Sequence, residues 1–396
     1  MLLFSWQLHA VPSSQVQFTN LNESITLTQA GNYYYLNGTE HRVQLTNRLI
    51  VKTSALSSKS DVKSYHADIQ QVTSLYQGDG FNYYLITANN ADFPLQLFNV
   101  LKGKKFEAQS NILLVQPDIL QIKTKAESEA NKSIQVAPYF SSLGIKSYWQ
   151  KSKGEGINIA VIDDGFDLTH PDLKHLTPIF SYDAETRQQV AAPLSRKDKH
   201  GTKVAGIIFA AHNKIGIDGL APKANLIAIR QPDTWTSNTL LSFQLAKLAN
   251  ADIINCSWHS NWLLEPISDI VNDLAENGRD GKGTAVIWAA GNKGIELTRN
   301  YHEAAIESAI TIGAVNSQYQ KMTFSNFGQA IDVFSYGDTA QTTIVPNRRG
   351  REYGNFSGTS LAAAVTSGLA ALVLAQQPKL TLAQLVTKLQ AITKTK

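Results

Sequence analysis

Residues 157–164 read INIAVIDD, a run of apolar and β-branched side chains that ends in two carboxylates. Comparable apolar runs follow at residues 225–230, 251–257, 284–292 and 309–315, and segments with helical spacing, such as 239–249 and 265–277, lie between them. This alternation predicts an α/β domain with a mostly parallel sheet flanked by helices. Ligands bind at the carboxyl ends of the strands in such sheets, so the chemistry is expected there.

Upstream of this domain, the sequence predicts a smaller α+β unit. The patterns indicate strands at residues 47–54, 81–88 and 111–119, and helices at 58–77 and 94–105. Residues 121–138 are polar and charged without periodicity, which is typical of a linker or an exposed cleavage segment. The domains expected are therefore an N-terminal extension (1–46), the small α+β unit (47–120), a linker or processing segment (121–138) and the large α/β domain (139–396).

The composition is that of a folded protein and argues against several classes of function. The chain has 396 residues, enough for a large domain and a smaller one, and only 17% of them are charged. A net charge of +4, spread along the chain, does not indicate a nucleic-acid-binding surface. The single cysteine, Cys256, excludes an internal disulfide and a cysteine-cluster metal site. No apolar run reaches the roughly 18 to 20 residues that span a bilayer.

The first residues, MLLFSWQLHAV, begin with apolar side chains but have neither a basic leader nor a long hydrophobic centre. Whether they are a degraded signal peptide therefore stays open at this point.

Four short motifs carry the groups that peptide-bond hydrolysis requires. Asp163 in VIDDG offers a carboxylate, His200 in HGTKVAG a base, Ser360 in GTSLAAA a hydroxyl and Asn292 in AAGNKG an amide. His200 and Ser360 stand at predicted helix starts, where unpaired backbone N–H groups stabilise negative charge. The Ser360 N–H and the Asn292 amide are candidate oxyanion donors. Taken singly, Asp163, His200 and Ser360 are each more typical of a turn or a helix cap than of a catalytic residue.

Together and in the order Asp, His, Asn, Ser, these motifs resemble those of the subtilisin-like serine peptidases, or subtilases, over roughly residues 135–387. The resemblance implies a serine endopeptidase that works through an acyl-enzyme, with Asp163, His200 and Ser360 as catalytic residues and Asn292 in the oxyanion hole. It implies that the small α+β unit is a propeptide, an intramolecular chaperone and inhibitor that is removed by a cut in the linker. A permanent domain is the alternative. It also implies a secreted or periplasmic location.

The resemblance further implies substrate-binding residues and a structural calcium ion, with no cofactor for catalysis. The residues matched to the substrate cleft are Ser257, Trp258, His259, Ala290 and Gly291. Those matched to the calcium site are Asp172, Asn213 and the carbonyls of Ile215 and Ile217, and such a mixture of oxygen ligands suits Ca²⁺. In the alternative interpretation, Asp172 caps a short helix and Asn213 makes a turn.

The sequence also departs from the family pattern. Ala364 replaces the proline that many members have after the nucleophile, and His259 replaces a glycine in the wall of the main specificity pocket, which it is expected to narrow or redirect. VIDDG and NCSW resemble the kexin branch, in which an acidic residue matching Asp164 favours basic side chains. Lys293 would repel such substrates. The specificity stays open, with general or moderately selective cleavage ahead of dibasic cleavage.

Two other functions fit parts of the sequence. A catalytically silent binding protein could keep this fold and hold peptides or its own N-terminal unit, but it is expected to have lost at least one of the four groups, and all four are present. An esterase or amidase acting on small molecules would require a GxSxG turn, and none surrounds Ser360.

Overall fold

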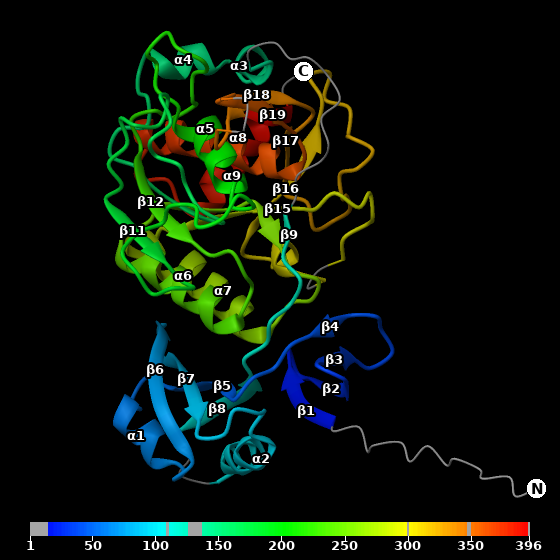
Figure 1. The fold of residues 1–396 in the computed structure, drawn as a ribbon. Helices are drawn as coiled ribbons and strands as arrows, with labels where there is room; N and C mark the ends of the chain where they lie inside the picture. The colour runs from blue at the N-terminus through cyan, green and yellow to red at the C-terminus, as the bar shows by residue number, and fades with distance from the viewer. Residues whose placement is uncertain (1–14, 108–110, 126–136, 299–300, 347–349, 395–396) are drawn as a thin grey trace, which may run out of the picture.

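A seven-stranded parallel sheet lies at the centre of the large domain (Figure 1). The computed structural model describes residues 15–107, 111–125, 137–298, 301–346 and 350–394. The strands, in sheet order, are β11 (Phe180–Asp183), β12 (Asn225–Arg230), β10 (Asn158–Asp163), β13 (Ile253–Cys256), β15 (Ala285–Ala289), β16 (Ile310–Val315) and β17 (Val333–Tyr336). All neighbouring pairs are parallel, so the prediction of a parallel sheet is confirmed.

Helices cover both faces of this sheet, as the alternating pattern predicts. One face carries α5 (His200–Phe209), α8 (Thr359–Gln376) and α9 (Leu382–Lys394), and the other carries α6 (Thr236–Leu248) and α7 (Glu265–Gly281) (Figure 1). The helix α8 is long and apolar enough to span a membrane, but 89% of it is buried inside the domain, as expected of a core helix. Short elements complete the domain: α3 (Tyr139–Ser142), α4 (Ile145–Trp149), β14 (Trp258–His259), η1 (Glu303–Ala305), β18 (Ala340–Thr343) and β19 (Tyr353–Phe356).

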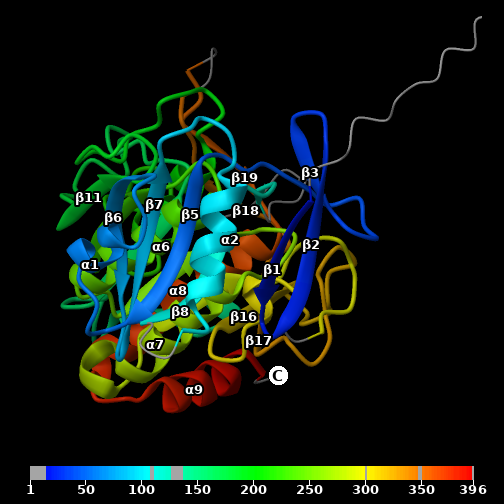
Figure 2. The same ribbon diagram turned by 90° about the horizontal axis from the view of Figure 1, so that it is seen from below.

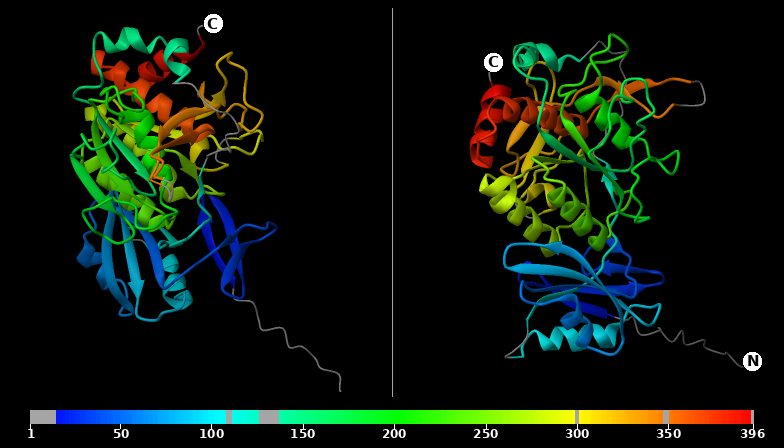
Figure 3. Two further views of the ribbon diagram at one scale, coloured as in Figure 1. Left: turned by 45° about the horizontal axis from the view of Figure 1, so that its top comes forward. Right: turned by 90° about the vertical axis from the view of Figure 1, so that its left-hand side faces the viewer.

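The small α+β unit is a four-stranded antiparallel sheet with two helices. Its strands are β6 (Ile69–Gln77), β7 (Phe81–Ala88), β5 (Arg48–Ser54) and β8 (Ile112–Pro117), in that order, and its helices are α1 (Lys59–Ser64) and α2 (Leu95–Lys104). One face of the sheet lies against α6 and α7, and α2 covers the other (Figure 3).

The predicted helix at 58–77 is wrong in its second half. Only residues 59–64 are helical, and residues 69–77 form β6, paired along its length with β7. The apolar spacing in this segment fits a helix, but the hydrogen bonds to β7 and burial against α6 decide for a strand.

Residues of the N-terminal extension form a separate antiparallel sheet beside the small unit (Figure 2). Its strands are β1 (Gln15–Asn20), β2 (Glu23–Ala30), β3 (Tyr33–Leu36) and β4 (Arg42–Val43). Leu21 and Asn22, both with positive φ, make the tight turn between β1 and β2. The stretch 1–14, on which the question of a degraded leader falls, lies outside the described residues.

After β8 the chain leaves the small unit and runs to the large domain (Figure 1). Its last described stretch before residue 137 contains β9 (Thr124–Lys125), which pairs antiparallel with β14. Most of the predicted linker, residues 126–136, lies outside the described residues.

Candidate active site

Three elements that are distant in sequence bring a carboxylate, an imidazole and a hydroxyl together. Asp163 is the last residue of β10, His200 the first of α5, and Ser360 the second of α8. The His200 Nδ1 atom lies 2.9 Å from each Asp163 carboxylate oxygen, and its Nε2 atom lies 3.1 Å from the Ser360 Oγ. All three side chains are buried. The predicted residues thus form one continuous chain of hydrogen-bonding groups.

The charges around Asp163 keep this carboxyl ionised. Burial acts to raise its pKa, but His200 and the ammonium groups of Lys123 and Lys125 outweigh burial, so the pKa of Asp163 is lowered. An ionised Asp163 accepts the Nδ1–H of His200, which leaves the Nε2 lone pair facing Ser360.

Asp164 has a role at this site that sequence reasoning missed. Its carboxylate accepts hydrogen bonds from the backbone N–H groups of Lys199, His200 and Gly201, at 3.1, 3.1 and 2.8 Å. It therefore satisfies N–H groups at the start of α5 and fixes the backbone that carries the imidazole. A Cβ at Gly201 would lie 2.5 Å from the Gly165 carbonyl oxygen, so this close approach requires glycine.

The side-chain amide of Asn292 is held through its oxygen atom. Its Oδ1 accepts hydrogen bonds from the Thr359 N–H at 3.0 Å and from the Thr359 hydroxyl at 2.9 Å. Its Nδ2 is buried and has no hydrogen-bond partner among the residues that the structure describes. A buried and unpaired donor is costly unless something binds it, so the position suits a ligand oxygen. Thr359, which orients this amide, was missed because its role depends on a contact 67 positions away.

The residues matched to the substrate cleft gather beside Ser360. The Ser360 hydroxyl donates to the Ser257 carbonyl at 2.8 Å, and Trp258 and His259 continue from there as β14. On the other side, Ala290 and Gly291 follow β15.

His259 is buried against His302 and Gly291. Its ring stacks on that of His302, with centroids 4.4 Å apart, and burial lowers the pKa of His259 to about 4, so the ring is neutral near pH 7. A Cβ on Gly291 would lie 2.9 Å from the His259 Nε2. The His259 imidazole therefore lies against Gly291. A glycine at position 259, as in the family pattern, would leave this space empty. The effect of His259 on specificity stays a prediction. His302 was not identified from the sequence.

The chain's own residues 123–125 lie on the residues matched to the substrate cleft. Thr124 pairs with His259 and Lys125 with Trp258, and the Lys125 ammonium contacts the Asp164 carboxylate. The Lys123 ammonium lies 4.5 Å from the centre of the Trp258 ring. An extended segment thus lies in front of the triad as an added strand.

The residues matched to a calcium site lie close together, but the contacts between them are hydrogen bonds donated by N–H groups. The Asp172 carboxylate accepts from the Asn213 Nδ2 at 3.1 Å and from the Ile217 N–H at 3.0 Å, while the Asn213 Oδ1 accepts from the Ile215 N–H at 2.8 Å. Asn213 thus makes the turn of the alternative interpretation, whereas the Asp172 carboxylate binds this turn and does not cap a helix. Calcium requires oxygen ligands, and the Asp172 carboxylate is the charged one among the residues matched to this site.

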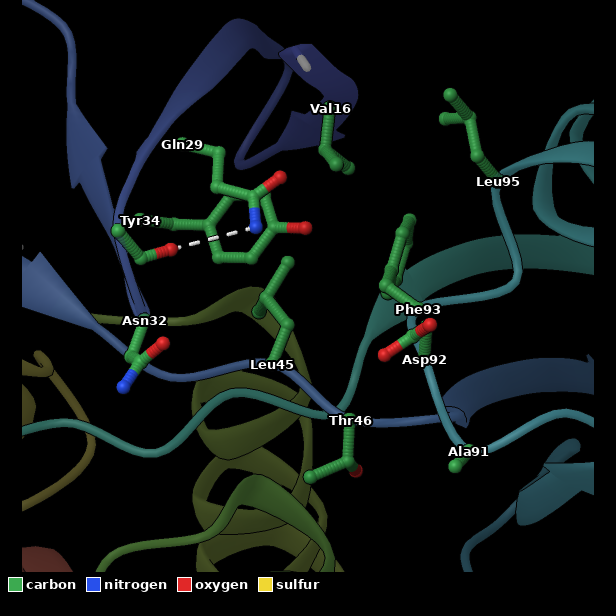
Figure 4. A pocket seen from close by; sticks show the side chains of 11 residues that line it. Val16, Gln29, Asn32, Tyr34, Leu45, Thr46, Ala91, Asp92, Phe93 and Leu95 are labelled. Atoms are coloured by element: carbon green, nitrogen blue, oxygen red, sulfur yellow. Dashed lines mark hydrogen bonds between the residues drawn. The ribbon is translucent and has the colours of Figure 1, made fainter. Parts of the chain in front are cut away.

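A hollow of about 500 Å³ lies far from this chemistry, between the N-terminal sheet and the small unit (Figure 4). Tyr34, Leu45 and Phe93 are among its lining residues, and none of the lining residues comes from the large domain. It marks the seam between two packed units, and we assign it no role in catalysis.

Comparison with known proteins shows which sequences this chain resembles. A family model described as the subtilase family matches residues 154–396. Subtilisin NAT of Bacillus subtilis subsp. natto is 33% identical over 271 residues, which cover 66% of this chain and 67% of that protein. The calcium-dependent protease of Nostoc sp. is 31% identical over 274 residues, which cover 60% of this chain and 41% of that protein.

Among solved structures, fervidolysin from Fervidobacterium pennivorans, a keratinolytic enzyme related to subtilisin, has a TM-score of 0.66 at 19% identity. The match covers 91% of this chain and 57% of fervidolysin. At this identity the likeness shows the fold alone.

Proposed function

The chain belongs to the subtilase family of serine endopeptidases, and on this premise we propose that Ser360, His200 and Asp163 are its catalytic triad and that it is made as a self-processing proenzyme. The observation that carries the proposal is the continuous contact from Asp163 through His200 to Ser360. Beside it lies the Asn292 amide N–H, which has no partner among the described residues. Polypeptides are the substrates, and a location outside the cytoplasm is proposed from the family alone.

The reaction follows from these positions. The Ser360 hydroxyl turns from the Ser257 carbonyl to His200, gives its proton to Nε2, and attacks the scissile carbonyl carbon. The Asn292 Nδ2–H and the Ser360 N–H hold the oxygen that becomes negative. His200 then protonates the leaving amine, and water releases the acyl group from Ser360 by the same steps.

Covalent labelling tests the triad directly. A fluorophosphonate reacts with an activated serine, so the purified protein should gain one label, and peptide mapping should place it on Ser360. A protein that stays unlabelled after processing, or that is labelled on another serine, contradicts the assignment and favours the binding-protein alternative.

The proenzyme proposal has support from the small unit, which lies on the large domain and continues into the cleft. Tyr76 of β6 donates to the buried Asp273 of α7 at 2.7 Å, and the Lys52 ammonium lies 2.7 Å from the Asp269 carboxylate. From there the chain enters the cleft as β9. A segment that fills the cleft excludes substrate, so the small unit inhibits the enzyme until it leaves.

The pairing register predicts the processing site. Lys125 lies opposite Trp258, so an occupying strand would set its next residue opposite Ser257, whose carbonyl contacts the Ser360 hydroxyl. That residue in the sequence is Ala126, which lies outside the described residues. We expect cleavage after Ala126, and N-terminal sequencing of the mature enzyme should begin at Glu127. Any other first residue contradicts this site, and no cleavage by an active enzyme favours a permanent domain.

A side chain of the N-terminal sheet helps to hold the proposed inhibitory unit on the large domain. The buried Asn20 side chain accepts from the Glu265 N–H at 2.7 Å, donates to the Leu263 carbonyl at 3.0 Å and accepts from the Gln116 amide at 3.3 Å. Glu265 in turn accepts the Leu21 N–H at 2.8 Å. Asn20 thus caps the start of α7 from another part of the chain and links all three units.

Asn20→Ala should therefore shorten the delay between self-cleavage and full activity. Removing these bonds leaves buried groups unpaired, at a cost of about 1–3 kcal/mol, or roughly 5- to 150-fold in the affinity of the cleaved unit. Peptidase activity followed over time measures the delay. The mature enzyme should be unchanged because residue 20 is removed. Ser24→Ala, an exposed position in the same sheet, is the control. Equal delays in both variants and the wild type would mean that Asn20 does not hold the cleaved unit on the enzyme.

Calcium is proposed as a structural ion at Asp172, supported by the name of the Nostoc relative and by the carboxylate buried in this loop. Binding would require the loop to turn carbonyl oxygens toward the ion. We expect EDTA to lower the melting temperature of the mature enzyme by about 5–10 °C, as for an ion present near 100 times its dissociation constant. In Asp172→Asn, the melting temperature should be the same in EDTA and in calcium. An unchanged melting temperature in EDTA would mean that the N–H groups hold the loop without an ion.

A further inference from the structure

We infer that the cleft selects polypeptides with a lysine or arginine at both the second and the fourth residue before the cleaved bond. This inference rests on the proposed function, because it assigns the substrate class of the same site. The carrying observation is the segment 123–125, which lies in the cleft as a strand with both of its lysines held by the large domain.

The register identifies the two positions. Thr124 lies opposite His259 and Lys125 opposite Trp258, so the residue after Lys125 would be the one whose carbonyl Ser360 attacks. Counting back from the bond, Lys125 is then the second residue and Lys123 the fourth. Side chains two apart on a strand share a face, which agrees with both lysines contacting the large domain.

Lys125 is recognised by a buried carboxylate. Its ammonium contacts the Asp164 carboxylate, which is 1% exposed, and donates to the Lys197 carbonyl at 3.3 Å. Burial acts to lower the pKa of Lys125, but Asp164 and Asp163 outweigh it and raise the pKa, so the side chain is charged. A neutral side chain at this position would shield the Asp164 carboxylate from water without supplying a cation to pair with it. Leaving a buried charge unpaired in this way is unfavourable.

Lys123 is recognised by an aromatic face and a carbonyl. Its ammonium lies over the Trp258 ring and donates to the Gln231 carbonyl oxygen. Asp163, Asp164 and Asp233 also attract it, against the burial that lowers its pKa. An aromatic face alone would accept an apolar side chain, whereas the carbonyl and the carboxylates favour a cation. Arginine keeps its charge more readily than lysine when buried, so it should also bind.

The nearby cation Lys293 does not oppose these two positions. Lys293 follows Asn292 in the sequence. Burial lowers the pKa values of His259 and His302, and the positive charge of Lys293 lowers them further. His259 is matched to the wall of the main specificity pocket, so the charge of Lys293 acts at that pocket. The cleft should therefore disfavour a basic side chain directly before the bond, which separates this selectivity from cleavage after paired basic residues.

A set of four coumarin amides tests the inference with the mature enzyme. The parent peptide is acetyl-Lys-Thr-Lys-Ala, and the others carry glutamine at the second position, at the fourth position, or at both. Hydrogen bonds to charged groups are worth about 1.5–3 kcal/mol, so each replacement should lower kcat/KM roughly 10- to 150-fold. A fifth peptide with arginine in both places should be cleaved within about threefold of the parent, which corresponds to about 0.7 kcal/mol.

Two variants assign the positions separately. In Asp164→Asn, the ratio of kcat/KM for lysine over glutamine should collapse at the second position and persist at the fourth. In Asp233→Asn, only the ratio at the fourth position should fall. Asp164 also supports His200, so its variant will lose turnover overall, but a ratio measured within one variant is unaffected by that loss.

Fluorophosphonate labelling and casein cleavage by the same preparation come first. If the enzyme is labelled and cleaves casein but the four peptides differ by less than about threefold, the selectivity is wrong and the triad stands. If the ratios are large but unchanged in both variants, the assigned contacts are wrong. If no label is taken up, the proposed function itself fails.

Discussion

Ser360→Ala should abolish peptide hydrolysis and leave the precursor uncut. The hydroxyl 3.1 Å from the His200 Nε2 is the proposed nucleophile, and alanine has nothing to replace it. The expected loss in kcat is about two million-fold, a magnitude known from subtilisin, a relative of this chain. A coumarin peptide measures the turnover, and gel electrophoresis of freshly made protein shows whether the chain remains whole.

Ser367→Ala is the matched control for this substitution. Ser367 is a buried serine on the same helix, and its hydroxyl bonds to the Ala363 carbonyl and receives the Asn255 amide. Its loss should lower stability but leave cleavage and turnover in place. If Ser360→Ala still cleaved itself with kinetics independent of protein concentration, another nucleophile would have to be sought.

Asn292→Ala should lower kcat by about 100- to 1,000-fold with little change in KM. The Nδ2 donor is buried and unpaired among the described residues, so it contributes when the substrate oxygen becomes negative. This magnitude also comes from subtilisin. Steady-state kinetics on one peptide separates kcat from KM, and a melting curve checks the fold. A rise in KM alone would mean that the amide binds the ground state and is not an oxyanion donor.

The groups proposed as catalytic could be named from the sequence because each stands in a local pattern with a physical reason. Asp163 ends an apolar strand, His200 begins a helix next to Gly201, which allows close packing, and Ser360 begins a helix after Gly358. The parallel sheet was predictable for the same reason, since strand and helix periods alternate within short windows. The small unit was predicted less well. Val62, Ile69 and Val72 fit a helical spacing, and only the pairing of β6 with β7 shows that residues 69–77 are extended.

Other parts of the site depend on contacts that no local pattern carries. Asn20 meets Glu265 across 245 positions, Thr359 orients Asn292 across 67, and His302 stacks on His259 from a different element. Lys123 and Lys125 were read as part of a polar linker, yet the fold places them against Trp258 and Asp164. The sequence by itself determined the class of chemistry and the alternation of strands and helices, because both are set by neighbouring residues. Only the tertiary structure decided which side chains occupy and shape the cleft, because those contacts form after distant segments have packed together.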